Sequence, residues 1–155
     1  MILAACLCSG LAAAEPPRVL PEGAVVEEWP HFLGPNLDAT TGEGPLLKKW
    51  PEDGLKVVWE VARGEGYACP VIAGGRLFYF HRSEGKEQID CRDPETGKLT
   101  WSHSYEIEYQ DRYGFSAGPR SSVVVSDGRV YAAGVTAQLH CLSADKGEVI
   151  WNSDL

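Results

Sequence analysis

An internal repeat constrains the fold of this chain more than any other feature. Residues 91–101 match residues 141–151 without a gap, and Gly75-Arg76 aligns with Gly128-Arg129 earlier in each unit. The matched stretches share a glycine and end on a tryptophan, which pairs Gly97 with Gly147 and Trp101 with Trp151. Trp59 precedes Trp101 at a comparable spacing and indicates the end of an earlier unit. The chain is therefore expected to be an array of similar supersecondary units.

Each unit contains four short segments rich in β-branched and aromatic residues, and no 3.6-residue period appears after the first residues. In the second unit we expect strands at 121–126, 129–134, 137–143 and 148–153, with a two-residue hairpin turn at Asp127-Gly128. Four strands in a unit of about 40–50 residues that ends on a tryptophan are typical of a propeller blade. We therefore predict an all-β fold, a β-propeller of four-stranded antiparallel blades.

The predicted organisation has four parts after the first residues. An extended lead-in with loops covers residues 15–54, in which Trp29 and Phe32 are expected to pin a loop to the core. The repeats follow as a strand at 55–61, a blade at 67–105 and a blade at 120–155. A ring needs roughly 4–8 blades, so two blades plus one strand are part of a propeller, and a truncated gene without a stable product is another interpretation.

The N-terminal residues 1–14 carry no charge and predict a signal peptide. Small residues at positions 12–14 precede Glu15-Pro16-Pro17, which favours cleavage after Ala14 and export to the periplasm or cell envelope. The segment is too short to cross a bilayer. No Lys or Arg precedes it, so the true start is expected upstream. A lipoprotein anchor at Cys6 is the alternative.

Charge and cysteine content exclude several other classes of protein. The net charge of -8 argues against nucleic-acid binding, which needs a basic face. Beyond the signal peptide the cysteines are Cys69, Cys91 and Cys141, an odd number that does not predict a disulfide framework. We interpret all three as small core residues.

The segment 93–101 resembles the tryptophan-docking repeat of quinoprotein propellers, and residues 144–151 fit the same pattern loosely. The segments 29–36 and 118–122 resemble exported proteins described as PQQ-binding-like β-propeller repeat proteins. This resemblance implies a propeller fold. It does not imply one activity, because the wider family includes PQQ-dependent alcohol dehydrogenases and the outer-membrane assembly lipoprotein BamB, which binds no quinone.

The sequence shows no convincing catalytic, cofactor or metal site. Acids such as Glu84, Glu87, Asp90 and Glu95 fall mostly near turns, and Asp93 and Asp145 are expected to cap the repeat turns. The histidines show no ligand spacing: His31, His81, His103 and His140. The resemblance implies that a quinoprotein dehydrogenase needs Ca²⁺ ligands and often two adjacent cysteines, and this chain has no such cysteine pair. PQQ with Ca²⁺ is therefore expected only in a complete dehydrogenase.

One position in the repeat suggests a binding site. Tyr67 and Arg120 align at the entry to the innermost strands, which face the central channel of a propeller, and Tyr113 lies in the nearby loop. These three residues are the candidate ligand-binding residues, although an ion pair of Arg120 with a neighbouring acid would explain it as well. We expect an exported non-catalytic scaffold that binds a protein or another ligand. The alternative is the N-terminal part of a PQQ-dependent alcohol dehydrogenase-like enzyme.

Overall fold

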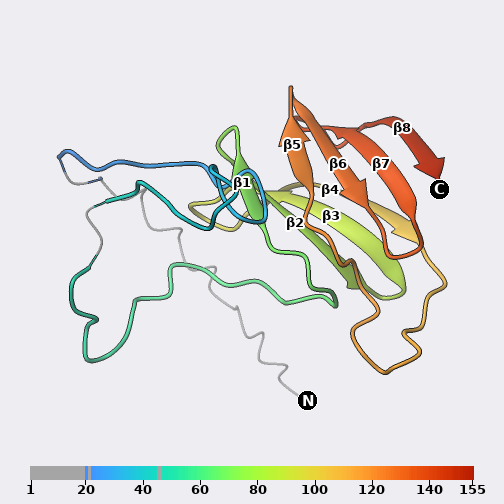
Figure 1. Cartoon of the computed structure of the whole chain (residues 1–155), viewed down its shortest axis with the longest axis horizontal. Coiled ribbons are helices and arrows are strands. Elements are labelled where there is room, and N and C mark those ends of the chain that lie inside the picture. Colours follow the sequence, from blue (N-terminus) through green and yellow to red (C-terminus); the bar gives the residue numbers. More distant parts are fainter. Residues whose placement is uncertain (1–19, 21, 45–46) are drawn as a thin grey trace, which may run out of the picture.

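The computed structural model describes residues 20, 22–44 and 47–155. The predicted signal peptide and the alternative anchor at Cys6 lie outside the described residues. Two four-stranded antiparallel sheets lie next to each other, and the described residues that precede them form long loops to one side, one of which lies beside the first sheet (Figure 1). The fold is therefore all-β, as predicted, with two four-stranded antiparallel sheets of the kind expected for propeller blades.

The first blade is a meander of strands that follow one another in both sequence and space. Its strands are β1 (Val71–Ala73), β2 (Arg76–Ser83), β3 (Lys86–Arg92) and β4 (Leu99–Glu106). The turn between β2 and β3 is confined to Glu84-Gly85, because the two strands stay paired up to Ser83 and Lys86. Glu87 is therefore a strand residue and does not lie at a turn.

The second blade repeats this order. Its strands are β5 (Val124–Ser126), β6 (Arg129–Ala133), β7 (Gln138–Ser143) and β8 (Val149–Asp154). The predicted hairpin turn at Asp127-Gly128 is confirmed, with φ angles of 50° and 71°. Both central residues have positive φ, as a type I′ turn requires. Strand β5 starts later than predicted.

The lead-in touches the first blade but adds no strand to the two sheets. Trp29 forms a single antiparallel bridge with Ile72 of β1. Phe32 is 60% exposed, so the prediction that it pins the loop to the core is wrong. Residues 55–61 are extended and belong to neither described sheet. Among the described residues they form no ladder with another strand, so the strand predicted there is absent.

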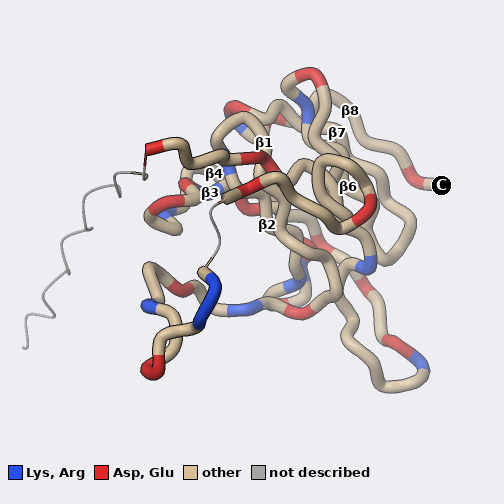
Figure 2. The backbone as a smooth tube through the Cα atoms, turned by 60° about the vertical axis from the view of Figure 1, so that its left-hand side comes forward, with Lys and Arg blue, Asp and Glu red and all other residues tan. Residues whose placement is uncertain are grey.

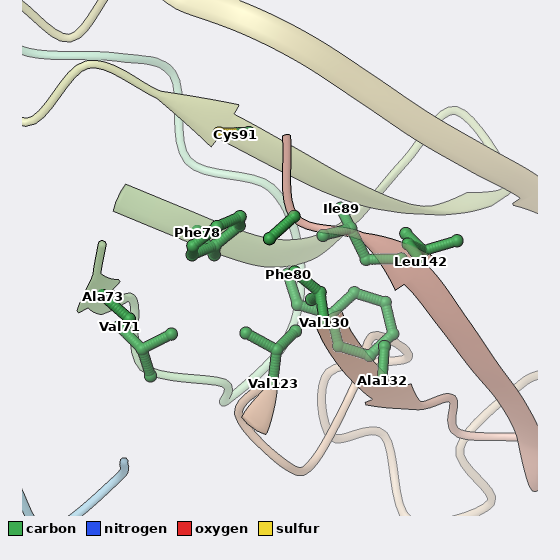
Figure 3. Close-up of a cluster of buried hydrophobic side chains, with 11 residues drawn as sticks. Val71, Ala73, Phe78, Phe80, Ile89, Cys91, Val123, Val130, Ala132 and Leu142 are labelled. Atoms are coloured by element: carbon green, nitrogen blue, oxygen red, sulfur yellow. The ribbon is translucent and has the colours of Figure 1, made fainter. Parts of the chain in front are cut away.

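The hydrophobic core lies between the two blades. Phe78, Phe80 and Ile89 of the first blade point toward Val130 and Leu142 of the second (Figure 3). Along each strand, successive side chains point to opposite faces of the sheet, so every second residue faces the other blade. Burial of this seam holds the two sheets together.

The repeated tryptophans dock on the repeated glycines of the next unit. Trp101 Nε1 donates to the carbonyl of Ala144 at 3.0 Å, and its ring packs on Gly147. Trp59 makes the same contacts one unit earlier, with a 2.9 Å bond to the carbonyl of Pro94 and its ring on Gly97. The match supports Trp59 as the end of an earlier unit, although residues 55–61 join neither sheet.

Trp151 has the third position in this series. Its ring lies 6.2 Å from Tyr131 with an interplanar angle of 52°, close to the 5.9 Å and 52° of Trp101 and Phe78. No neighbouring blade covers it among the described residues, and it is 43% exposed. Trp151 therefore packs on its own blade but, within the described part of the chain, lacks the inter-blade contact that Trp101 makes.

Two local predictions need correction. Cys91 and Cys141 are buried core residues, as expected, but Cys69 is exposed because it precedes β1, outside the ladder. Asp93 accepts bonds from the backbone of Glu95 and Thr96, as predicted. Asp145 does not have this capping role, because the residue equivalent to Asp93 in the second repeat is Ser143. Asp145 instead forms a 2.8 Å ion pair with Arg76 of the first blade.

Acidic and basic residues are both spread over many turns and loops (Figure 2). Within the described part of the chain, no helix has the length and apolar character needed to traverse a bilayer.

Candidate functional site

The structure brings two of the three predicted ligand-binding residues together. The backbone N–H of Tyr67 donates to the carbonyl of Pro119 at 2.8 Å, which joins the two segments that lead into β1 and β5. The guanidinium carbon of Arg120 lies 5.0 Å from the centre of the Tyr67 ring. This distance is within the range of a cation–π interaction.

Close packing of two backbone segments explains why residue 118 is a glycine. A side chain at Gly118 would collide with the backbone of Glu65 and Gly66, and Pro119 is fully buried. Only a residue without a Cβ permits this approach. Gly118-Pro119 therefore fixes the position from which Arg120 extends.

Arg120 also forms the ion pair that the alternative interpretation anticipated. Its Nη2 lies 2.8 Å from Asp111 Oδ2. Burial opposes ionisation of Asp111, but backbone bonds from Phe115 and Tyr113, together with the charge of Arg120, lower its pKa overall. Asp111 thus stays ionised at neutral pH and holds the guanidinium in place over Tyr67.

Tyr113 does not join the pair through its ring. The ring lies 4.6 Å from the guanidinium carbon of Arg112 and is 69% exposed. Its backbone N–H donates to Asp111 Oδ1 at 2.9 Å. Its described contribution is therefore to the loop around Asp111.

A hollow of about 260 Å³ adjoins the Tyr67–Arg120 pair. Its wall includes His31 and Phe32 from the lead-in, and Ser122 and Val124 from the entry to β5. The sequence analysis missed His31 and Phe32, because nothing in the local pattern of residues 29–36 shows which later segment they approach. We name this hollow, with Phe32, Tyr67 and Arg120, the inner mouth.

A second polar group lies in the seam between the blades, and the sequence did not reveal it. Glu87 of β3 is 0% exposed, although its local sequence suggested a solvated turn. Its carboxylate accepts bonds from the Tyr105 hydroxyl at 2.7 Å and from the backbone N–H of Val135 at 2.9 Å. Burial and the neighbouring Glu87 raise the pKa of Tyr105, so its hydroxyl remains a donor.

Replacing Glu87 by alanine should destabilise the protein by about 1–3 kcal/mol, because a buried hydroxyl and a buried N–H lose their acceptor. Glu87→Gln should cost less, since an amide retains one acceptor for Val135. Urea unfolding followed by tryptophan fluorescence measures the difference. Glu106→Ala is the control, because this carboxylate is 78% exposed. Equal stability of the Glu87→Ala variant and the control would contradict the buried network.

The opposite face of the first blade holds another buried carboxylate. Asp90 accepts a 2.7 Å bond from Gln88 and a 2.6 Å bond from Arg92. Burial would raise the pKa of Asp90, but the nearby ring of His81 and the hydrogen bonds from Gln88 and Arg92 outweigh it and lower the pKa well below the usual range. Asp90 therefore belongs inside the blade and not at a solvated turn.

The histidines of the seam make stability depend on pH. Burial lowers the pKa of His103 and His140 below 6.5, and for His140 the neighbouring His103 adds to this while Asp154 opposes it. The unfolded chain then binds more protons than the folded chain once the pH falls below about 6.5. Stability is therefore present above that pH and is lost as the pH decreases.

We expect the melting temperature to fall between pH 7.5 and pH 5.5, and to fall less in the double variant His103→Gln/His140→Gln. Asp90 does not contribute to this decrease, because its carboxylate is ionised in both the folded and the unfolded chain between pH 5.5 and pH 7.5. The stability that its lowered pKa provides is lost only at much more acidic pH. Thermal melts of both proteins at the two pH values test the prediction. An identical decrease in the two proteins would contradict it.

Comparison with known proteins shows which family the second half of the chain resembles. The family model described as "Outer membrane protein assembly factor BamB" matches residues 85–155. These residues are similar to PQQ-like propeller repeats. A comparison with curated proteins gave no match.

Several solved structures resemble the chain that contains these PQQ-like repeats. One is a europium-containing methanol dehydrogenase, with 13% identity and a TM-score of 0.49 over 64% of this chain and 18% of that chain. Another is the quinohemoprotein alcohol dehydrogenase from Comamonas testosteroni, with 25% identity and a TM-score of 0.43 over 59% and 13% of the two chains. BamB from Moraxella catarrhalis has 20% identity and a TM-score of 0.39 over 59% and 23%. The chain spans less than a quarter of each of these proteins.

Proposed function

We propose that this protein is an exported, non-catalytic PQQ-like propeller domain that binds a protein or another ligand at the inner mouth. The observation that carries the proposal is the meeting of Tyr67 and Arg120 beside a hollow that Phe32 also lines. Aromatic and arginine side chains are enriched where proteins bind their partners. We propose a protein segment as the first occupant to test.

The donor set does not fit PQQ held by Ca²⁺. Calcium takes about 6–8 oxygen ligands, several of them carboxylates. Over residues 20, 22–44 and 47–155, no group of three or more His, Cys, Asp or Glu side chains is placed to hold a metal ion. The one carboxylate bonded to Arg120 in the inner mouth, Asp111, already accepts two backbone N–H groups.

Photo-crosslinking in cells tests the binding proposal. A photoreactive phenylalanine at Phe32 should form an adduct with an envelope protein, and Arg120→Ala should abolish that adduct. The matched control is Phe115, which is 63% exposed, compared with 60% for Phe32, and does not line the hollow. Adducts from both positions, or none from Phe32, would contradict binding at the inner mouth.

Titration with PQQ and Ca²⁺ distinguishes the scaffold from part of a dehydrogenase. We expect no saturable change in quinone absorbance with the purified chain. Saturable binding in the micromolar range would favour the dehydrogenase-like alternative.

Export is tested at the N-terminus. The mature protein isolated from the cell envelope should begin at Glu15, because small residues precede this position as signal peptidase requires. N-terminal sequencing gives the answer. A lipid-modified Cys6 would replace this prediction with the anchored alternative.

A further inference from the structure

Two histidines from different blades face each other across the seam. His103 lies on β4 and His140 on β7, and His103 Nε2 is 3.3 Å from His140 Nδ1. The ring centres are 5.2 Å apart and the planes are tilted by 53°. The spacing of the two histidines in the sequence does not predict this contact, because only the packing of the two blades brings β4 and β7 together.

The distance between the nitrogens suits a shared metal ion. In the metal-free chain one nitrogen can donate weakly to the other, because 3.3 Å lies just beyond the usual range of about 2.7–3.2 Å for a hydrogen bond from a nitrogen. Two imidazole nitrogens bound to one tetrahedral zinc ion at about 2.0–2.1 Å lie about 3.3–3.4 Å apart. We propose that His103 and His140 form a binding site for a transition-metal ion of the Zn²⁺ type.

Oxygen ligands are available on the same face of the second blade. The register pairs Asn152 with His140 and Asp154 with Gln138, so these four side chains lie on one side of β7 and β8. They line a polar hollow of about 180 Å³ together with Ser153. Because His140 lines this hollow, the hollow would provide room for water beside the ion.

The two histidines supply two nitrogen ligands, one from each blade. No third His, Cys, Asp or Glu completes a cluster among the described residues, so water and the oxygens of Asn152 or Asp154 would fill the remaining positions. Such a site is open and exchangeable. Imidazole ligands favour Zn²⁺, Cu²⁺ or Ni²⁺ over Ca²⁺ and Mg²⁺.

The surroundings hold the ligands in position. The Tyr105 ring stacks on His140 with 4.0 Å between ring centres and 17° between planes. Glu87 holds the Tyr105 hydroxyl, and Val135 holds Glu87. Supporting contacts of this kind orient metal ligands and raise affinity. An ion bound here would join β4 of one blade to β7 of the next.

Calorimetric titration with Zn²⁺ alone tests the site. The chain should bind one ion, and His103→Gln or His140→Gln should weaken binding by more than about tenfold. His31→Gln is the control, because His31 lines the inner mouth and not the seam. Zn²⁺ should raise the melting temperature of the unsubstituted chain and the control but not of the two variants. Binding that persists in His103→Gln, or no saturable binding by the unsubstituted chain, would overturn the proposal.

A measurement on the unsubstituted chain removes dependence on the folding of the variants. X-ray absorption of the Zn²⁺-loaded protein should report two imidazole ligands with oxygen in the remaining positions. A spectrum with oxygen ligands only, or with one imidazole, would refute the shared site.

Discussion

Replacing Trp101 by alanine should destabilise the protein by about 3–5 kcal/mol, the cost of a large aromatic side chain removed from a packed interface. The indole joins the first blade to the second through the carbonyl of Ala144 and the surface of Gly147. Its loss would also uncover Phe78, on which the ring packs. Urea unfolding followed by circular dichroism measures the change.

Trp151→Ala is the matched control for Trp101→Ala. Both tryptophans occupy the same place in their units, but a following blade covers only Trp101 among the described residues. We expect Trp151→Ala to cost about 1–2 kcal/mol and to reduce aggregation, because it removes exposed apolar surface. Light scattering at increasing protein concentration measures aggregation. Equal destabilisation by the two changes would contradict the proposed docking.

Replacing Gly147 by alanine should destabilise the protein by about 2–4 kcal/mol, from a positive φ and an overpacked contact together. Gly147 has a φ of 70°. A Cβ there would lie 2.5 Å from the Trp101 ring, so the indole would have to move. Chemical denaturation of the variant gives the size of the effect.

A substitution at Gly128 distinguishes the cost of the positive φ from the cost of the overpacked contact. Its φ is 71°, but a Cβ there would meet nothing within 4 Å. Gly128→Ala should therefore cost only about 1–2 kcal/mol, the conformational part alone. Combining Gly147→Ala with Trp101→Ala should remove the clash, so the two costs should not add. Additive costs would show that Gly147 serves the turn and not the docking.

These glycines show a limit of the repeat pattern. The sequence identified Gly97 and Gly147 as equivalent residues of the repeat, and both have the positive φ angles of turn glycines. It did not show that the same glycines form the surface on which the preceding tryptophan packs. That second role depends on a residue in another unit, and no local rule places it.

The inner mouth was predicted in part. Alignment of the units placed Tyr67 and Arg120 at equivalent positions, and the structure brings them together. The loop that contains Asp111 and the lead-in that contains Phe32 were not connected to them. Irregular segments have no period, so their path over the blades could not be derived from the sequence.

By itself the sequence determined the all-β class, the order of the blade strands and the hairpin turns, because period-two alternation and glycine positions are local properties. Tertiary structure decided which polar residues enter the seam. Glu87 and His140 are buried because a second sheet covers their faces, and Cys141 is buried on the other face between Tyr131 and Trp151. Alternation distinguishes the two faces of a strand, but only the packing of neighbouring blades determines what covers each face.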